Sequence, residues 1–144
     1  MPTEQYRHNG SGQFSRWRLQ MAERMAAQLD PERFGVRAVY LVGSTKSGTA
    51  GPASDIDLVV LFEGTPRQRD ELMLWLEGWS LCLDEMNALE TGYRTGGLLD
   101  VHVVTDEDVA KRTSFAIKIG SPTDPARPLS LKKRPGSPVR STPG

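Results

Sequence analysis

Apolar residues recur along the chain at two different spacings, which separate expected helices from expected strands. Over residues 14–29 and again over residues 66–89 they return every three or four positions, as in an amphipathic helix. Other segments are almost continuously apolar and rich in β-branched side chains, as in buried strands. These expected strands are residues 36–42, 56–62 and 98–104.

The order of these segments predicts an α/β (α+β) domain, with a small mixed sheet flanked by helices. A last helix is expected from about residue 106 to about residue 117, because Thr105 and the carboxylates after it suit a helix N-terminus. The whole pattern falls within residues 13–120, a length typical of one domain. The pairing order of the strands stays open, because the apolar pattern does not encode it.

Both ends of the chain are predicted to be disordered. Residues 1–12 are polar, and residues 121–144 hold six of the ten prolines and few apolar side chains. Such segments bury too little apolar surface to offset the entropy of ordering them. The second segment is also basic, with five Lys or Arg residues against one acidic residue. We interpret it as a solvated tail, and contact with nucleic acid is the less favoured alternative.

Charge and cysteine content narrow the classes of protein to which the chain can belong. The formal net charge is zero, so no overall field favours nucleic acid or a membrane surface. No run approaches the roughly 20 apolar residues of a membrane helix, and the polar N-terminal segment lacks the apolar core of a secretory signal. Cys82 is the only cysteine, which fits a reducing compartment. We therefore expect a cytoplasmic protein without membrane or nucleic-acid partners.

Three aspartates lie in or beside the expected strands. Asp55 and Asp57 stand two residues apart at the start of the second strand, so both side chains point to one face, with Cα atoms about 7 Å apart. Two such carboxylates repel each other, and a divalent cation such as Mg²⁺ removes that penalty. Asp100, in the third strand, can reach the same place. Three carboxylates can hold two Mg²⁺ ions about 3.5–4 Å apart, an arrangement suited to in-line phosphoryl displacement.

The turn before these carboxylates contains groups suited to phosphate. Gly43 lets the backbone approach a phosphate closely, and Ser44 offers a hydroxyl and an amide N–H. Lys46 follows two residues later and can meet the outer phosphates of a nucleotide. Gly43, Ser44 and Lys46 are therefore the candidate nucleotide-binding residues.

A resemblance to a known family rests on residues 43–60, which read GSTKSGTAGPASDIDLVV. This stretch is similar to the signature of the DNA polymerase beta-like nucleotidyltransferase superfamily, and especially to its minimal nucleotidyltransferases. Residues 14–119 fit the layout of that family. The resemblance implies a nucleotidyltransferase fold. It also implies metal-dependent transfer of a nucleoside monophosphate from an NTP, with ATP the expected donor, to a hydroxyl of a small molecule or protein, releasing pyrophosphate.

The resemblance also implies a role for each residue of the motif. Gly43 and Ser44 would bind phosphate, and Asp55 and Asp57 would bind both metal ions. Asp100 would bind the catalytic metal and help to deprotonate the acceptor. In one respect the chain differs from the family: where basic residues are frequent, it has Thr45 and Ser47 on either side of Lys46.

Simpler interpretations stay open for Asp100 and His102, two residues of the third strand. Asp100 could be a solvent-facing strand residue, whereas Asp57 in the second strand interrupts an apolar segment and needs a partner. His102 shares a face with Asp100, and we interpret it as a half-buried sheet histidine rather than as part of an acceptor pocket. Other candidates for the third carboxylate are Asp84, Glu85 and Glu90.

Two rival functions also stay open. The chain could be an antitoxin-like protein that nucleotidylates or masks a helical partner protein. It could instead be a regulatory domain that binds NTP without transfer, although the presence of three carboxylates favours transfer. Trp75 and Trp79 would belong to a docking surface under the first alternative, but we interpret them as core residues.

Overall fold

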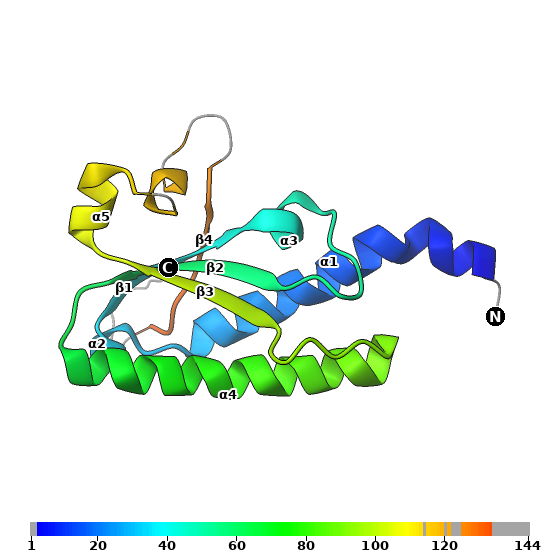
Figure 1. The fold of residues 1–144 in the computed structure, drawn as a ribbon, viewed down its shortest axis with the longest axis horizontal. Coiled ribbons are helices and arrows are strands. Elements are labelled where there is room, and N and C mark those ends of the chain that lie inside the picture. Colours follow the sequence, from blue (N-terminus) through cyan, green and yellow to red (C-terminus); the bar gives the residue numbers. More distant parts are fainter. Residues whose placement is uncertain (1–2, 114, 120, 122–124, 134–144) are drawn as a thin grey trace, which may run out of the picture.

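The computed structural model describes residues 3–113, 115–119, 121 and 125–133, with side chains from residue 12 on. A four-stranded mixed sheet lies at its centre, with helices on both faces (Figure 1). The strands are β1 (Val36–Val42), β2 (Ile56–Phe62), β3 (Leu99–Val104) and β4 (Arg127–Leu129). The helices are α1 (Thr3–Gln28), α2 (Pro31–Phe34), α3 (Gly43–Ser47), α4 (Pro66–Thr91) and α5 (Asp106–Lys111), followed by a 3₁₀ turn at Ala116–Lys118. This architecture confirms the predicted α/β class and mixed sheet.

The strands lie in the order β3-β2-β1-β4. β1 is antiparallel to both β2 and β4, and β2 is parallel to β3. A parallel pair needs a long crossover connection, which α4 supplies by running back across the sheet (Figure 1). The parallel pairing of β2 and β3 is the step that the apolar pattern left open.

The main core fills the space between one face of the sheet and the two long helices. Its fully buried members come from α1, the residue after it, α4 and the strands, and include Met25, Leu29, Leu41, Leu58, Leu72, Leu76 and Leu83. Trp75 packs against this core, with its ring centroid 5.6 Å from that of Phe34 and 6.1 Å from that of Trp79. The interpretation of the two tryptophans as core residues is confirmed.

The opposite face of the sheet is only partly covered. A smaller buried cluster there consists of Val42, Val59, Val104, Ala116 and Ala126. Successive strand residues point to opposite faces, so Asp57, two residues before Val59, lies on this second face. Polar side chains can therefore stand on β2 and β3 without entering the main core.

The two predicted capping sequences are present. Thr65 and Gln68 form a reciprocal capping box at the start of α4, and Thr105 and Asp108 form another at the start of α5. α5 is shorter than predicted, because Arg112 adopts a left-handed conformation (φ 55°) and ends it. Although α1 and α4 have 26 residues each, no helix in the described part of the chain is long and apolar enough to cross a bilayer.

The predicted disorder at the N-terminus differs from the structure, in which α1 begins at Thr3. A polar composition reduces burial, but it does not prevent local i to i−4 hydrogen bonds from forming. The first helix is therefore longer than the amphipathic pattern over residues 14–29.

The predicted disorder from residue 121 on is wrong for residues 125–133. β4 pairs with the outer edge of β1, and Leu129 is only 7% exposed. The amide of Lys132 also donates to the carbonyl of Leu29, at 3.1 Å. Proline-rich composition hid this strand, although proline is tolerated on an edge strand such as the one that holds Pro128. Residues 134–144 of the predicted tail lie outside the described residues.

We predict that Leu129→Ala lowers the free energy of unfolding by about 2–3 kcal/mol, the lower part of the range for a buried leucine. Urea denaturation followed by circular dichroism measures the change, and Ser130→Ala, at the exposed next position, is the control. Equal stability of the Leu129→Ala variant and the wild type would show that β4 does not contribute to the fold.

Candidate active site

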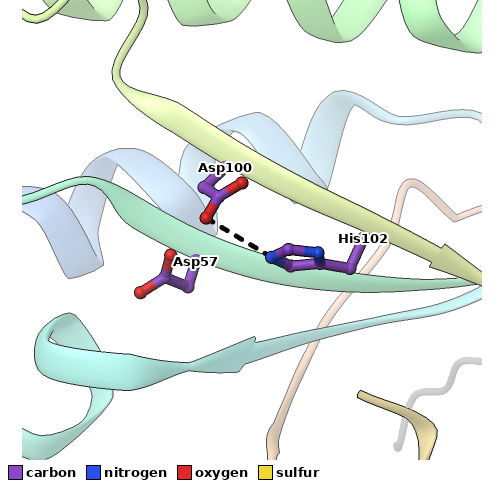
Figure 2. A group of neighbouring side chains, drawn as sticks. All are labelled: Asp57, Asp100 and His102. Atoms are coloured by element: carbon purple, nitrogen blue, oxygen red, sulfur yellow. Dashed lines mark ion pairs between the residues drawn. The ribbon is translucent and has the colours of Figure 1, made fainter. Parts of the chain in front are cut away.

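The second face of the sheet brings two aspartates of the predicted site together. In the parallel pair, Asp57 of β2 stands in register with Asp100 of β3, and in the antiparallel pair Asp57 faces Val42 of β1. Figure 2 shows the side chains of Asp57 and Asp100 on the same side of these strands. The alternative that Asp100 is only a solvent-facing residue is therefore not favoured, although its side chain is 49% exposed.

His102 completes a three-residue group that we call the acidic cluster: Asp57, Asp100 and His102. One ligand atom from each lies within 4.8 Å of the other two. His102 Nε2 is 3.4 Å from Asp100 Oδ2 (Figure 2). The imidazole stacks on the ring of Phe115, with centroids 3.5 Å apart and planes 10° apart. The histidine is half-buried as expected, but it is also held in place beside the carboxylates.

The electrostatics of the acidic cluster are unfavourable to a second negative charge. The pKa of Asp57 is raised to about 6 by burial, by a hydrogen bond to Asp100 and by the charges of Asp100 and Asp55, with His102 acting in the opposite direction. Carboxylates that crowd in this way are stabilised by a divalent cation, for which carboxylate oxygens are suitable ligands. The donor set of the acidic cluster therefore fits a metal ion.

Gly43 shows why a glycine stands at the start of the motif. Its φ of +77° is a left-handed conformation, and a β-carbon added here would collide with Oδ2 of Asp57. The glycine thus lets the backbone between β1 and α3 lie directly against the metal-ligand candidate. Ser44 follows in the first turn of α3 and is half-buried.

Lys46 does not extend freely into solvent. Its ammonium group donates a hydrogen bond to the carbonyl of Pro125, at 2.8 Å, in the segment just before β4. A contact between Lys46 and the outer phosphates, which stays a prediction, would require the side chain to leave this carbonyl.

Asp55 lies just before β2 and is exposed. It is not part of the acidic cluster, but it is close enough for the charges of Asp100 and Arg18 to affect it. Burial and the charge of Asp100 raise the pKa of Asp55, whereas the positive charge of Arg18 lowers it. The structure therefore places the three predicted aspartates in one region, with Asp55 at its margin.

Two of the other candidate carboxylates have different partners. Asp84 is buried and accepts hydrogen bonds from the Thr95 and Gly96 amides, which help to lower its pKa despite its burial. Glu85 forms an ion pair with Arg94. Glu90 is exposed near the end of α4, and none of the three belongs to the acidic cluster.

A family model described as nucleotidyltransferase domain matches residues 26–129. The chain belongs to this family. The match includes the glycine turn, all three aspartates, His102 and the β4 strand that the composition had hidden. No curated protein and no solved structure matches the sequence. The nucleotidyltransferase domain supports transfer of a nucleoside monophosphate from an NTP, and the acidic cluster is suited to a metal ion.

Sequence reasoning missed two buried residues next to this nucleotidyltransferase site, Arg18 and Asn87. Arg18 stands on the apolar side of α1, four residues after Phe14 and four before Ala22, although arginine is a residue type that is mostly exposed. Asn87 stands in α4 among apolar positions. Helical spacing was the signal that could have shown their burial, because Arg18 shares a face with Ala22 and Met25, and Asn87 shares one with Leu83. Their partners could not be predicted, because these include backbone carbonyls of distant loops.

We predict that Asp57→Asn stabilises the metal-free nucleotidyltransferase domain at neutral pH. Because folding raises the pKa of Asp57 from 3.8 to about 6, the folded state binds the proton more tightly. The contribution of Asp57 to stability is therefore lost as the pH rises from about 4 to about 6. At pH 7.5 in EDTA the melting temperature of the variant should be higher by roughly 2–6 °C.

The difference should shrink towards pH 4, and added Mg²⁺ should raise the melting temperature of the wild type more than that of the variant. Thermal denaturation across pH measures both effects, with Asp70→Asn, an exposed position near the start of α4, as control. A variant that is less stable than the wild type in EDTA at every pH would contradict this account of the site.

Proposed function

We propose that the protein transfers a nucleoside monophosphate, with ATP as the donor, to a hydroxyl of a small molecule or protein and releases pyrophosphate. The proposal is supported above all by the register that places Asp57 beside Asp100, next to a glycine turn in a nucleotidyltransferase domain. Two Mg²⁺ ions would be held by Asp55, Asp57 and Asp100. When bound, they would neutralise charge on the triphosphate and lower the pKa of the acceptor hydroxyl.

In this proposal the residues of the chain divide the work. Gly43 and Ser44 present backbone and hydroxyl groups to the phosphates, and Asp55 and Asp57 hold the metal that arrives with the triphosphate. Asp100 accepts the proton of the acceptor hydroxyl. The hydroxyl oxygen then forms a bond to the α-phosphorus while the bond from that phosphorus to the β-phosphate oxygen breaks, and pyrophosphate leaves with the electron pair.

The acidic cluster gives this division a physical basis. Asp57 is half-buried between Gly43 and Asp100, whereas the Asp100 side chain is about half exposed and can meet an incoming acceptor. His102 lies against Asp100 on the side away from the glycine turn, where its stack on Phe115 limits its rotation. We infer that His102 orients the Asp100 carboxylate.

We predict that Asp57→Ala and Asp100→Asn separate binding from chemistry. Asp57→Ala removes a shared metal ligand, so the affinity for Mg-ATP should fall together with transfer. Asp100→Asn preserves shape but cannot accept the proton, so Mg-ATP affinity should change little while transfer falls by roughly 10²–10⁴. Calorimetric titration measures binding. Transfer of label from α-labelled ATP, in an extract of the cells that make the protein, measures the reaction.

The exposed Asp70→Asn serves as the control for both measurements. Wild-type transfer by Asp100→Asn would show that another group is the base. Loss of Mg-ATP binding by Asp100→Asn to the extent seen with Asp57→Ala would show that Asp100 shares the binding role. Undiminished Mg-ATP binding by Asp57→Ala would show that the aspartates are structural.

A further inference from the structure

An arginine of α1 has its entire side chain inside the protein. Arg18 is 0% exposed, which is rare for arginine unless its charge is paired or its donors are satisfied. Its guanidinium carbon lies 5.6 Å from the ring centroid of Trp17 and 6.0 Å from that of Phe14. Because an arginine is costly to bury, its partners indicate what it stabilises.

The partners of Arg18 belong to the loop that leads into the site. Its Nε donates to the carbonyl of Ser54, at 3.0 Å, and its Nη2 donates to the carbonyl of Pro52, at 3.2 Å. Ser54 immediately precedes Asp55 in the chain. The guanidinium therefore fixes the backbone next to the aspartate that lies at the margin of the acidic cluster.

Asn87 joins Arg18 to a second loop. Its Oδ1 accepts from Arg18 Nη2 at 3.0 Å, and its Nδ2 donates to the carbonyl of Pro52 at 2.8 Å and to that of Tyr93 at 3.2 Å. Asn87 is 1% exposed. One buried amide thus connects the loop before β2 with the loop before β3, and these strands carry Asp57 and Asp100.

Two further polar residues on α4 hold the second loop in place. Asp84, one turn before Asn87, accepts from the amides of Thr95 and Gly96 at 2.8 and 3.0 Å. Ser80, another turn earlier, accepts from the Leu99 amide at 3.0 Å. Several side chains of α4 therefore hold the loop before β3. In the loop before β2, Pro52 and Ser54 accept their side-chain hydrogen bonds from α1 and α4 through Arg18 and Asn87.

The charge of Arg18, like its hydrogen bonds, connects it to the segment that contains Asp55. Burial makes the positive charge of the guanidinium costly, and the negative charge of Asp55 offsets part of that cost. Arg18 thus places a compensating charge near Asp55 while its hydrogen bonds hold the backbone on which Asp55 stands.

We propose that Arg18, with Asn87, is a positioning residue that holds Asp55 in place as a metal ligand. The inference rests on the proposed function, because it assumes that Asp55 binds the metal. Arg18 acts through the Pro52 and Ser54 carbonyls and does not itself touch the nucleotide. Residues that orient metal ligands in this way contribute to metal affinity without binding the ion.

The test measures Mn²⁺ binding to the full chain from the electron paramagnetic resonance signal of free Mn²⁺. Arg18→Lys keeps the charge but loses the fork of donors, so the dissociation constant should rise by roughly 10-fold or more, the usual effect of removing such a support. Arg16→Lys, at an exposed position of the same helix, should bind as the wild type does. All measurements are made well below the melting temperature of each variant.

A double-mutant cycle separates positioning from general destabilisation. If Arg18 acts through Asp55, Arg18→Lys should weaken Mn²⁺ binding much less in an Asp55→Asn background, because the ligand that it supports has already gone. An equal effect in both backgrounds, or unchanged Mn²⁺ affinity despite a lower melting temperature, would overturn the inference.

Asn87→Ser provides a second variant should Arg18→Lys fail to fold. It removes the amide contacts to Pro52 and Tyr93 and should also weaken Mn²⁺ binding, and unchanged affinity would count against the inference. A wild-type protein that binds no Mn²⁺ would overturn the proposed function, and the inference with it. Normal wild-type binding with unaffected variants would overturn the inference alone.

Discussion

The parallel pairing of β2 with β3 is the constraint on which the rest of the site depends. It places Asp57 and Asp100 side by side on a partly covered face of the sheet. Two carboxylates in that position repel each other, and the raised pKa of Asp57 is the measure of that repulsion and of burial. The fold therefore carries a local electrostatic cost without a cation, and a bound cation would convert the same arrangement into a stable centre.

The remainder of the molecule stabilises the fold against this electrostatic cost and fixes the positions of the loops that lead to the carboxylates. The main core, between the sheet and the helices α1 and α4, lies on the face away from the carboxylates, so most of the apolar burial that stabilises the domain is separate from the site. Polar side chains of the same two helices form hydrogen bonds with the loops before β2 and β3. Binding groups on strands and loops are thus supported from the core side, as expected for a preorganised site.

Much of this arrangement could be predicted from particular residues. Asp57 in an otherwise apolar strand indicated a polar partner, and the two-residue spacing of Asp100 and His102 placed both on one face. The parallel pairing stayed open, since the helix expected between the second and third strands permits a parallel crossover, but the apolar pattern does not show which strands are neighbours. Strand β4 was missed because three residues containing Pro128 carry no strand pattern and gain their order only from pairing with β1. The partners of the buried Arg18 could not be predicted, because they include backbone carbonyls at positions 52 and 54.

The central claim is that the carboxylates on β2 and β3 bind a divalent metal together with a nucleoside triphosphate. Its most direct test is a crystal structure with Mn²⁺ and an ATP analogue whose α–β bridge cannot be cleaved, with the metal located by anomalous scattering. The account predicts Mn²⁺ coordinated by Asp57 and by the triphosphate, with the glycine turn at Gly43 against the phosphates. Nucleotide bound elsewhere, or Mn²⁺ without a ligand from Asp57, would contradict it.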